Sequence, residues 1–515
     1  MNKSRTHYSV LNIVAGFAGY FLNVLIGYIC RMVFARCLND DYLGANSLFS
    51  SLLSMLSLAE LGIGGAIGYA LYKPLAEDNH EKIASLMQFF KKAYIAIGIV
   101  VGLAGLAMMP FLSSIITTPP NIKENIYAIY LFFLFNTASS YFFSYKGTLI
   151  IAAQENYLVC GISYISTIVQ SLIQIPLLLL TRNYILYLTV QLVCTFMANF
   201  CISKVADKQF PYILNNDIEP LSKQELKALF INVKALTINK ISQLLVNSTD
   251  SIVITYLRGL ALTGKVSNYT LLVNTLNSLI TQLFTGLTAS VGNLNAVESD
   301  EKKYSFFKAL NLSNFWIFSW GTVGIALVSS DLVQLCFGDN YLLDWKIPFV
   351  LALNFYIVGM QNAIYTYKNT MGLFRYGQYL LLLTAAINLI LDFVLGIRFG
   401  ALGIFLASTI ARLCTNTWYE PYAVFRYGLH LPFRHYVKTY LNYFFVLLLS
   451  GIVSLTICSW CQFSLIINVI LKIVICSVVV NCVVFGVYGR TEDGKYLRQM
   501  MLNVLARVRT MIINK

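Results

Sequence analysis

Seven Lys and Arg residues stand inside, or at the edges of, long apolar stretches of this 515-residue sequence. They are Arg31, Lys146, Lys234, Lys240, Lys368, Arg412 and Lys472. Three acids, Glu60, Asp250 and Asp392, have similar surroundings. A charge at the centre of a spanning helix costs about 2.5–3.5 kcal/mol on insertion scales and usually faces a protein interior or a watery cavity. Because the excess is positive, we expect an anionic passenger, above all a phosphate or pyrophosphate, which Lys and Arg bind by charge-assisted hydrogen bonds.

Five of these cations are candidates for a cationic cavity, and four further residues are candidates for lining it or coupling an ion. The five candidate cations are Arg31, Lys146, Lys234, Lys240 and Lys368. The cavity-lining or ion-coupling candidates are Glu60, Asn247, Asp250 and Arg412. Plainer alternatives remain: a lysine near a helix end can extend to the membrane surface, and Arg412 can pair with a neighbouring acid. The polar stretch 247–251 is more typical of a water-lined wall than of a lipid-facing one.

The composition indicates that these charges belong to a membrane protein. Of the residues, 57% are hydrophobic and only 12% are charged, whereas a soluble domain carries about 25% charged residues. A spanning helix needs about 20 mostly apolar residues, and fourteen segments qualify. They are 12–35, 43–70, 93–115, 126–149, 157–180, 183–205, 232–256, 266–291, 308–334, 348–371, 377–397, 401–424, 437–458 and 464–487. Because the runs are continuous, we expect helices and not the alternating strands of a barrel.

Lys and Arg residues in the loops indicate the orientation, because cytoplasmic loops carry the excess of these residues. With the N-terminus inside, the inside segments hold 23 of them and the outside loops hold 7. We therefore expect a multi-pass protein of the cytoplasmic (inner) membrane with both termini cytoplasmic. Most of the net charge of +14 then reports topology, and we expect no nucleic-acid partner.

Two local matches point to an internal repeat. Segments 145–148 and 367–370 share Tyr, Lys and Thr at an offset of 222 positions, and 43–47 parallels 263–267 at an offset of 220. Both offsets map a span onto the sixth span after it, so the two copies have the same membrane orientation, as in parallel-repeat transporters. We expect an all-α polytopic membrane protein of about fourteen transmembrane helices: two parallel-repeat six-helix lobes around a central cationic cavity, plus two extra C-terminal helices.

The expected organisation follows from these spans. It is an N-lobe at 1–206, a cytoplasmic inter-lobe linker at 207–230, a C-lobe at 231–427, spans thirteen and fourteen at 428–490 and a cytoplasmic amphipathic tail helix at 491–515. Ser222 followed by Glu225 fits a capping box, so the linker should hold a short helix that leads into span seven. Apolar residues at helical spacing among basic ones favour a tail helix on the cytoplasmic leaflet over a frayed tail.

The sequence holds no catalytic or metal-binding constellation. The four His residues lie in expected cytoplasmic segments and form no ligand set. No GxxxxGK[ST] phosphate loop occurs, and the longest internal loop, about 25 residues, is too short for a catalytic domain. We therefore expect a protein that is not an enzyme, with no metal and no cofactor, and with H⁺ or Na⁺ as the open choice of coupling ion.

The chain resembles the Wzx-like oligosaccharide flippases of the multidrug/oligosaccharidyl-lipid/polysaccharide exporter superfamily. The segments that carry the resemblance are 31–36, 42–44, 53–64, 145–148, 152–157, 232–241 and 246–254. The resemblance implies alternating access by two lobes. It also implies a polyprenyl-pyrophosphate-linked oligosaccharide as passenger, moved from the cytoplasmic to the outer leaflet for O-antigen, capsule or exopolysaccharide biosynthesis. The five candidate cations would contact its pyrophosphate and sugars.

Other functions stay open at this point. A peptidoglycan lipid-precursor flippase shares the cationic interior, whereas a cation-coupled small-molecule antiporter of the same superfamily would have twelve spans and an acidic interior. A non-transporting membrane scaffold or scramblase would have no need of charged spans. The expected partners are the lipid-linked glycan, membrane lipids and, as candidate protein partner, the polysaccharide polymerase machinery. We expect a monomer.

Overall fold

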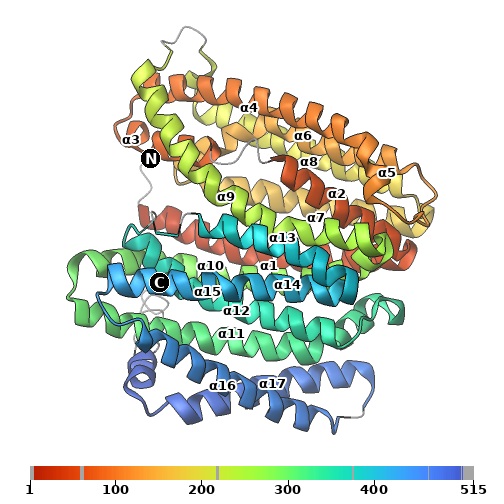
Figure 1. Ribbon diagram of the computed structural model, residues 1–515. Helices are drawn as coiled ribbons and strands as arrows, with labels where there is room; N and C mark the ends of the chain where they lie inside the picture. The colour runs from red at the N-terminus through yellow and green to blue at the C-terminus, as the bar shows by residue number, and fades with distance from the viewer. Residues whose placement is uncertain are drawn as a thin grey trace. The chain divides into compact units, whose positions relative to one another are not determined.

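The structure, a computed structural model, describes residues 5–57, 63–215, 220–373, 376–377, 379–461, 463–499 and 502. Over these residues the chain is all-helical, as the continuous apolar runs predict, and the described ranges contain no strand. Contacts divide the chain into two compact units, residues 1–264 and 265–515 (Figure 1).

The first unit contains nine α-helices and two 3-10 turns among its described residues, and the start of a tenth α-helix. They are α1 (Arg5–Cys37), α2 (Asp40–Leu56), α3 (Ile63–Ala76), α4 (His80–Met108), η2 (Met109–Phe111), α5 (Leu112–Ile115), α6 (Ile126–Ala152), α7 (Asn156–Thr181), α8 (Tyr184–Gln209), η3 (Pro211–Leu214), α9 (Lys223–Arg258) and the beginning of α10 (Leu260–Val297). An N-terminal asparagine begins four of these helices: Asn39, Asn79, Asn125 and Asn183 each accept a hydrogen bond from a backbone N–H of the first turn. This bond satisfies a donor that the helix itself leaves unpaired.

The second unit contains the rest of α10 and the helices after it. They are α11 (Asp300–Phe337), η4 (Asp339–Tyr341), α12 (Lys346–Thr370), α13 (Leu380–Phe399), α14 (Ala401–Cys414), α15 (Asn416–Ala423), the π-turn η5 (Val424–Gly428), α16 (Arg434–Cys458) and α17 (Leu465–Tyr488). Among all described residues, ten helices are long and apolar enough to cross a membrane. The other four expected spans fall on α2 with α3, on α9, on α10 and on α14 with α15, which are helical too.

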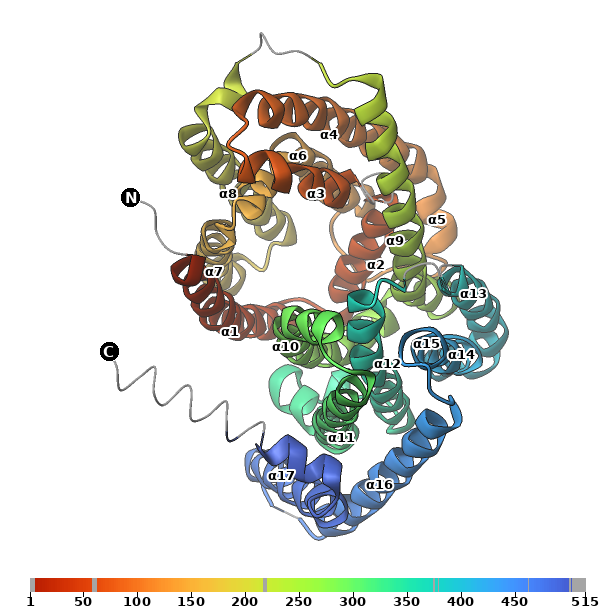
Figure 2. The ribbon, with the colours of Figure 1, turned by 90° about the vertical axis from the view of Figure 1, so that its left-hand side faces the viewer.

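The same packing order occurs in both units. In the first unit α4 packs on α6, α6 on α8 and α7 on α8. In the second unit α11 packs on α12, α12 on α14 and α15, and α13 on α14. These helices correspond through the predicted repeat, so the fold agrees with it. The seventh expected span, α9, packs on α2 and α3 of the first unit (Figure 2). The lobe limits expected at residues 206 and 231 stay predictions.

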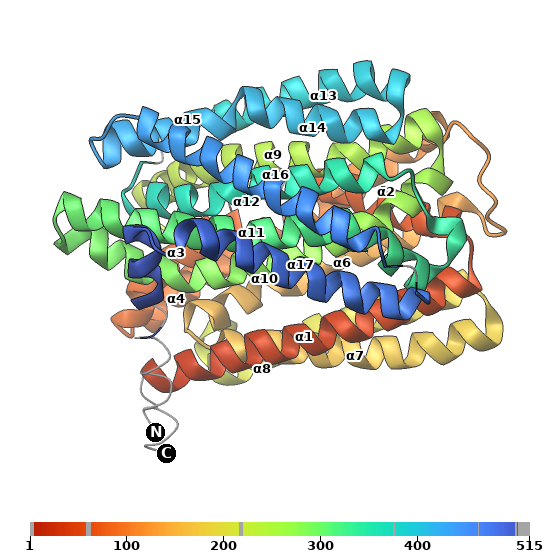
Figure 3. The ribbon, with the colours of Figure 1, turned by 90° about the horizontal axis from the view of Figure 1, so that it is seen from below.

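The two added helices pack on one side of the second unit, where α17 runs along α11 and α16 along α17 (Figure 3). Three polar contacts join α17 to α11: Trp316 Nε1 donates to Asn481 Oδ1 at 2.8 Å, Trp320 Nε1 donates to Ser477 Oγ at 2.9 Å, and Lys472 Nζ lies 2.5 Å from Asp331 Oδ2. One intramembrane cation of the sequence, Lys472, is therefore the partner of an acid on a neighbouring helix.

Segments related by the 220-residue offset contact each other at backbone distance. A Cβ atom added to Gly44 would lie 2.0 Å from the Leu260 carbonyl oxygen, and one added to Gly264 would lie 2.0 Å from the Asp40 carbonyl oxygen. Asp40 and Leu260 are themselves 220 positions apart, so the contact is reciprocal, like an isologous interface. Only glycine fits at both positions. This explains why segments 43–47 and 263–267 share a glycine at the same place.

The linker and the tail differ from expectation in their extent. The predicted capping box forms between Ser222 and Glu225, but it begins the long helix α9 and not a separate short helix. Residues 492–499 are helical. Asp493 lies 2.8 Å from Lys308 of α11, and Leu497 is buried in the core of the second unit. The start of the tail thus packs on protein, while 500–501 and 503–515 lie outside the described residues.

Candidate functional site

One predicted cation of the first unit, Lys146, forms an ion pair with an acid two helices later. Lys146 lies in the last two turns of α6, and its Nζ donates to Asp207 Oδ1 of α8 at 2.6 Å. Both side chains are largely buried, with exposed fractions of 13% and 15%. Gly147 of α6 faces Ile202 of α8, where an added Cβ atom would lie 3.4 Å from Ile202 Cγ2. The close approach of α6 and α8 brings the two charges together.

The repeat-related cation of the second unit, Lys368, has the same arrangement. It lies in the last turn of α12, and its Nζ donates to Glu420 Oε2 of α15 at 2.5 Å. The exposed fractions are 10% for Lys368 and 1% for Glu420, so this pair is buried more deeply than the first. Gly377, with a φ of +75°, passes over the carboxylate: a Cβ atom there would lie 3.3 Å from Glu420 Oε1.

Both acids were missed by the sequence analysis. Asp207 is 61 residues from its lysine and Glu420 is 52 residues from its own. One local signal exists for Asp207, because it lies in the last turn of α8. The negative end of the helix macrodipole disfavours a carboxylate there. Such an acid therefore points to a nearby cation, but it does not say which one.

The expected twelfth span is broken at Thr415, next to the Lys368–Glu420 pair. α14 ends one residue before Thr415 and α15 begins one residue after it. Pro421 lies inside α15, where its ring removes a backbone donor and kinks the helix. Thr384 of α13 contacts the hydroxyl of Thr415 and the amide oxygen of Asn416, each at 2.7 Å, and all three residues are buried. Discontinuous helices recur at the transport sites of repeat-built transporters.

Two further candidates, Arg31 of the first unit and Arg412 of the second, each lie on a helix that contacts other helices of its own unit. Arg31 is half-buried on α1, three residues before Phe34, whose ring contacts Tyr184 and Tyr187 of α8. Arg412 lies in the last turn of α14. Tyr365 of α12 is within electrostatic reach of both Arg412 and Glu420. The second unit thus gathers charged and polar groups from α12, α14 and α15.

The acids Asp250 and Asp392 lie on helices that are polar at those points. Asp250 is half-buried on α9; its neighbours Ser248 and Thr249 are buried, and Ser251 is 3.3 Å from Ser47 of α2. The stretch 248–251 therefore packs partly against α2. Asp392 is fully buried on α13, and its Oδ2 accepts a hydrogen bond from Asn388 at 2.7 Å.

The structure does not describe the side chains of the remaining candidates. Glu60 is not among the described residues. Lys234, Lys240 and Asn247 lie in α9, but their side chains are not described. Their roles stay predictions, and so do those of Arg31, Asp250 and Arg412.

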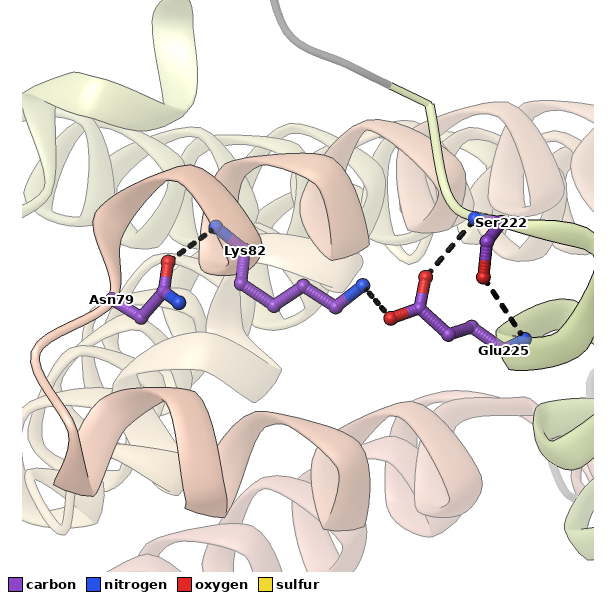
Figure 4. Close-up of polar contacts among 4 residues, drawn as sticks. All are labelled: Asn79, Lys82, Ser222 and Glu225. Carbon is purple, nitrogen blue, oxygen red and sulfur yellow. Dashed lines mark hydrogen bonds and ion pairs between the residues drawn. The ribbon is translucent and has the colours of Figure 1, made fainter.

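A polar cluster joins the start of α9 to the start of α4 (Figure 4). Glu225 accepts hydrogen bonds from Lys82 Nζ and from the Ser222 backbone N–H, while the Ser222 hydroxyl accepts from the Glu225 N–H. Asn79 caps α4 by accepting from the Lys82 N–H at 3.0 Å. The bond from Lys82, followed by those from Ser222, lowers the pKa of Glu225 to about 2. The linker is thus fixed to the first unit where α9 begins.

No protein-family model matches the sequence, and no curated protein matches it significantly. Solved structures do match, and they are transporters. A lipid II flippase, MurJ, in an inward-closed conformation has a TM-score of 0.65 at 15% identity, over 92% of this chain and 99% of that chain. A MATE transporter from Vibrio cholerae has a TM-score of 0.50 at 13% identity, over 82% of this chain and 99% of that chain.

A third solved structure is a MOP-superfamily transporter from Pyrococcus furiosus, described for the reversed polarity of its binding pocket. Its TM-score is 0.50 at 10% identity, over 84% of this chain and 100% of that chain. The chain therefore has the two-lobe helical fold of MOP-superfamily transporters. Membership of the Wzx-like branch stays a prediction from the sequence resemblance.

Proposed function

We propose that this protein is a flippase that moves a polyprenyl-pyrophosphate-linked oligosaccharide from the cytoplasmic to the outer leaflet of the inner membrane for surface polysaccharide synthesis. The observation that carries the proposal is the likeness to a lipid II flippase, which covers 92% of the chain at a TM-score of 0.65. The Vibrio cholerae and Pyrococcus furiosus transporters each have a TM-score of 0.50. Alternating access by the two lobes would move the passenger, as in other repeat-built transporters.

The excess of intramembrane cations supports an anionic passenger. We assign passenger contact to Arg31 on α1 and to Lys234 and Lys240 on α9. Arg31 is half-buried within an apolar helix, where an arginine is costly and usually functional. Lys146 and Lys368 are left out of this set because carboxylates already neutralise them. Glu60, Asn247, Asp250 and Arg412 stay candidates for lining the path or for coupling H⁺ or Na⁺.

A gene deletion tests the function. We expect a lipid-linked oligosaccharide to accumulate, with its glycan on the cytoplasmic side of the membrane. The wild-type gene should clear it, and Arg31→Ala and Lys240→Ala should each leave most of it. Lys92→Ala serves as the control, because Lys92 is an exposed residue of α4, and it should complement like the wild type. If no lipid-linked intermediate accumulates, the flippase proposal is wrong. If both alanine variants complement fully, only the assignment of contacts is wrong.

The identity of the accumulated intermediate distinguishes the proposed function from its main alternative. The flippase in the matching structure is named for lipid II, which favours a peptidoglycan lipid-precursor flippase as the second candidate. In that case the deletion would accumulate the peptidoglycan precursor and stop cell-wall growth, while surface polysaccharide would be lost only secondarily. A small-molecule antiporter would accumulate neither lipid, and its deletion would instead raise sensitivity to exported compounds.

A further inference from the structure

Among the described residues, each unit contains a buried lysine–carboxylate pair at an equivalent place. Lys146 and Lys368 are related by the repeat, and each lies near the C-terminal end of the fourth helix of its copy. Each pairs with an acid on the last expected span of the same copy, Asp207 on α8 or Glu420 on α15. We call these two pairs the lobe clamps. The two acids are 213 positions apart, whereas the two lysines are 222 positions apart. Both copies therefore form a lysine–carboxylate pair, although the acids do not occupy matching positions in the repeat.

The burial of the acids argues against passenger contact by these lysines. An anionic passenger that bound Lys368 would have to displace Glu420, whose side chain is 1% exposed. A buried carboxylate without its cation is strongly destabilising. Each lysine therefore neutralises its buried acid, and each acid fixes the position of its lysine.

The second clamp also holds a short element in position. α15 has only eight residues and follows the break at Thr415. A helix of this length has little stability of its own, so its place depends on tertiary contacts. The Lys368–Glu420 pair attaches it to α12, and the Thr384 contacts attach its start to α13.

We propose that the lobe clamps fasten the fourth helix to the last helix within each repeat, so that each pair of helices moves as one body during transport. Lys146 and Lys368 are thus positioning residues that do not contact the passenger. This inference goes beyond the proposed function, because it concerns the coupling of helices and holds for any passenger.

Double variants test the clamps. We compare Lys368→Met, Glu420→Gln and the double variant of the full-length protein, with Lys146→Met, Asp207→Asn and their double variant as the second set. Removal of either partner should lower the Tm of the purified protein by a similar amount. The neutral double variant should recover most of the loss, because no buried charge is left unpaired. Export in the deletion strain should follow the same order and return to within about threefold of wild type in the doubles.

Hydrogen exchange gives a readout that does not depend on transport. In Glu420→Gln, amides of residues 416–428 should exchange at least tenfold faster than in the wild type, and the double variant should restore protection. Lys302→Met is the matched control. It breaks an i,i+4 pair with Glu298 whose side chains are 69% and 41% exposed, and such surface pairs contribute little. It should change neither Tm nor exchange.

Three results would overturn the proposal. If Lys368→Met abolishes export while Glu420→Gln keeps wild-type export and Tm, Lys368 contacts the passenger. If a double variant regains its Tm but not export, the lysine has a role beyond the clamp. If the doubles are as unstable as the singles, the charges are not coupled. Failure of the flippase proposal is separate, because it shows in the accumulated lipid and leaves the Tm and exchange results unaffected.

Discussion

At the scale of single residues, the partners of a cation decide what it can do. The sequence contains seven intramembrane cations of similar appearance, and those whose side chains the structure describes have different surroundings. Lys146, Lys368 and Lys472 each meet a carboxylate within 2.6 Å. Arg31 is half-buried near an aromatic cluster. A cation that is already neutralised by a buried acid is a poor ligand for an anionic passenger, so the first three have structural roles in our interpretation.

The pH dependence of the α4–α9 contact follows from the pKa of Glu225, which is about 2. Because this pKa lies below the unfolded value of about 4.3, the stabilisation is present above that value and is lost as the pH falls through 2. We expect the difference in Tm between the wild type and Glu225→Gln to stay constant from pH 8 to pH 5. A difference that shrinks already between pH 7 and pH 6 would contradict this pKa.

The capping box of α9 should be measurable on its own. Ser222→Ala removes the hydroxyl that accepts from the Glu225 N–H, and the loss of such a cap costs about 1 kcal/mol. Amides in the first turn of α9 should then exchange about fivefold faster. Ser222→Asn keeps an acceptor and should stay close to wild type. Gln224→Ala, at an exposed neighbouring position, is the control. An equal effect from Gln224→Ala would exclude the cap as the cause.

At the scale of elements, helix ends and helix contacts place the functional groups. The fourth and last helices of each repeat approach closely enough for the lobe clamps, and the break at Thr415 separates α15 from α14. The first unit also contains the start of α10, whose glycine meets the start of α2. This contact joins two helices without side chains between them.

Alanine at the reciprocal glycines tests that contact. In Gly44→Ala or Gly264→Ala the new Cβ would lie 2.0 Å from a backbone carbonyl oxygen, and the backbones must separate because neither atom belongs to a flexible side chain. We expect a lower Tm and loss of export in both variants. Gly27→Ala is the matched control, since nothing lies within 4 Å of its added Cβ, and alanine favours a helix. Wild-type behaviour of both test variants would contradict the close contact.

At the scale of the whole molecule, the fold of MOP-superfamily transporters covers nearly the entire chain. Two repeats with the same packing order, followed by α16 and α17 docked on α11, form this architecture. The fold alone does not select a passenger, because one fold serves many functions. The excess of intramembrane cations supplies that part of the proposal.

Ligand binding should therefore stabilise the whole protein. A polyprenyl pyrophosphate at 100 times its Kd should add about 2.7 kcal/mol to the folded state, seen as a higher Tm in detergent. The polyprenyl alcohol of the same length should have a much smaller effect, because it lacks the anionic group. Arg31→Ala should reduce the shift from the pyrophosphate and leave that from the alcohol unchanged. Equal shifts from both lipids would argue against a pyrophosphate site.

The sequence by itself determined the helical membrane fold, the repeat and the capping box at Ser222. These features depend on local patterns: continuous apolar runs, matching segments at two offsets, and a serine three residues before a glutamate. It also marked the unusual cations. Only the tertiary structure decided that Lys146 and Lys368 have acidic partners, because Asp207 and Glu420 are 61 and 52 residues away from them. Helix rotation and packing bring such groups together, and no local pattern encodes that rotation.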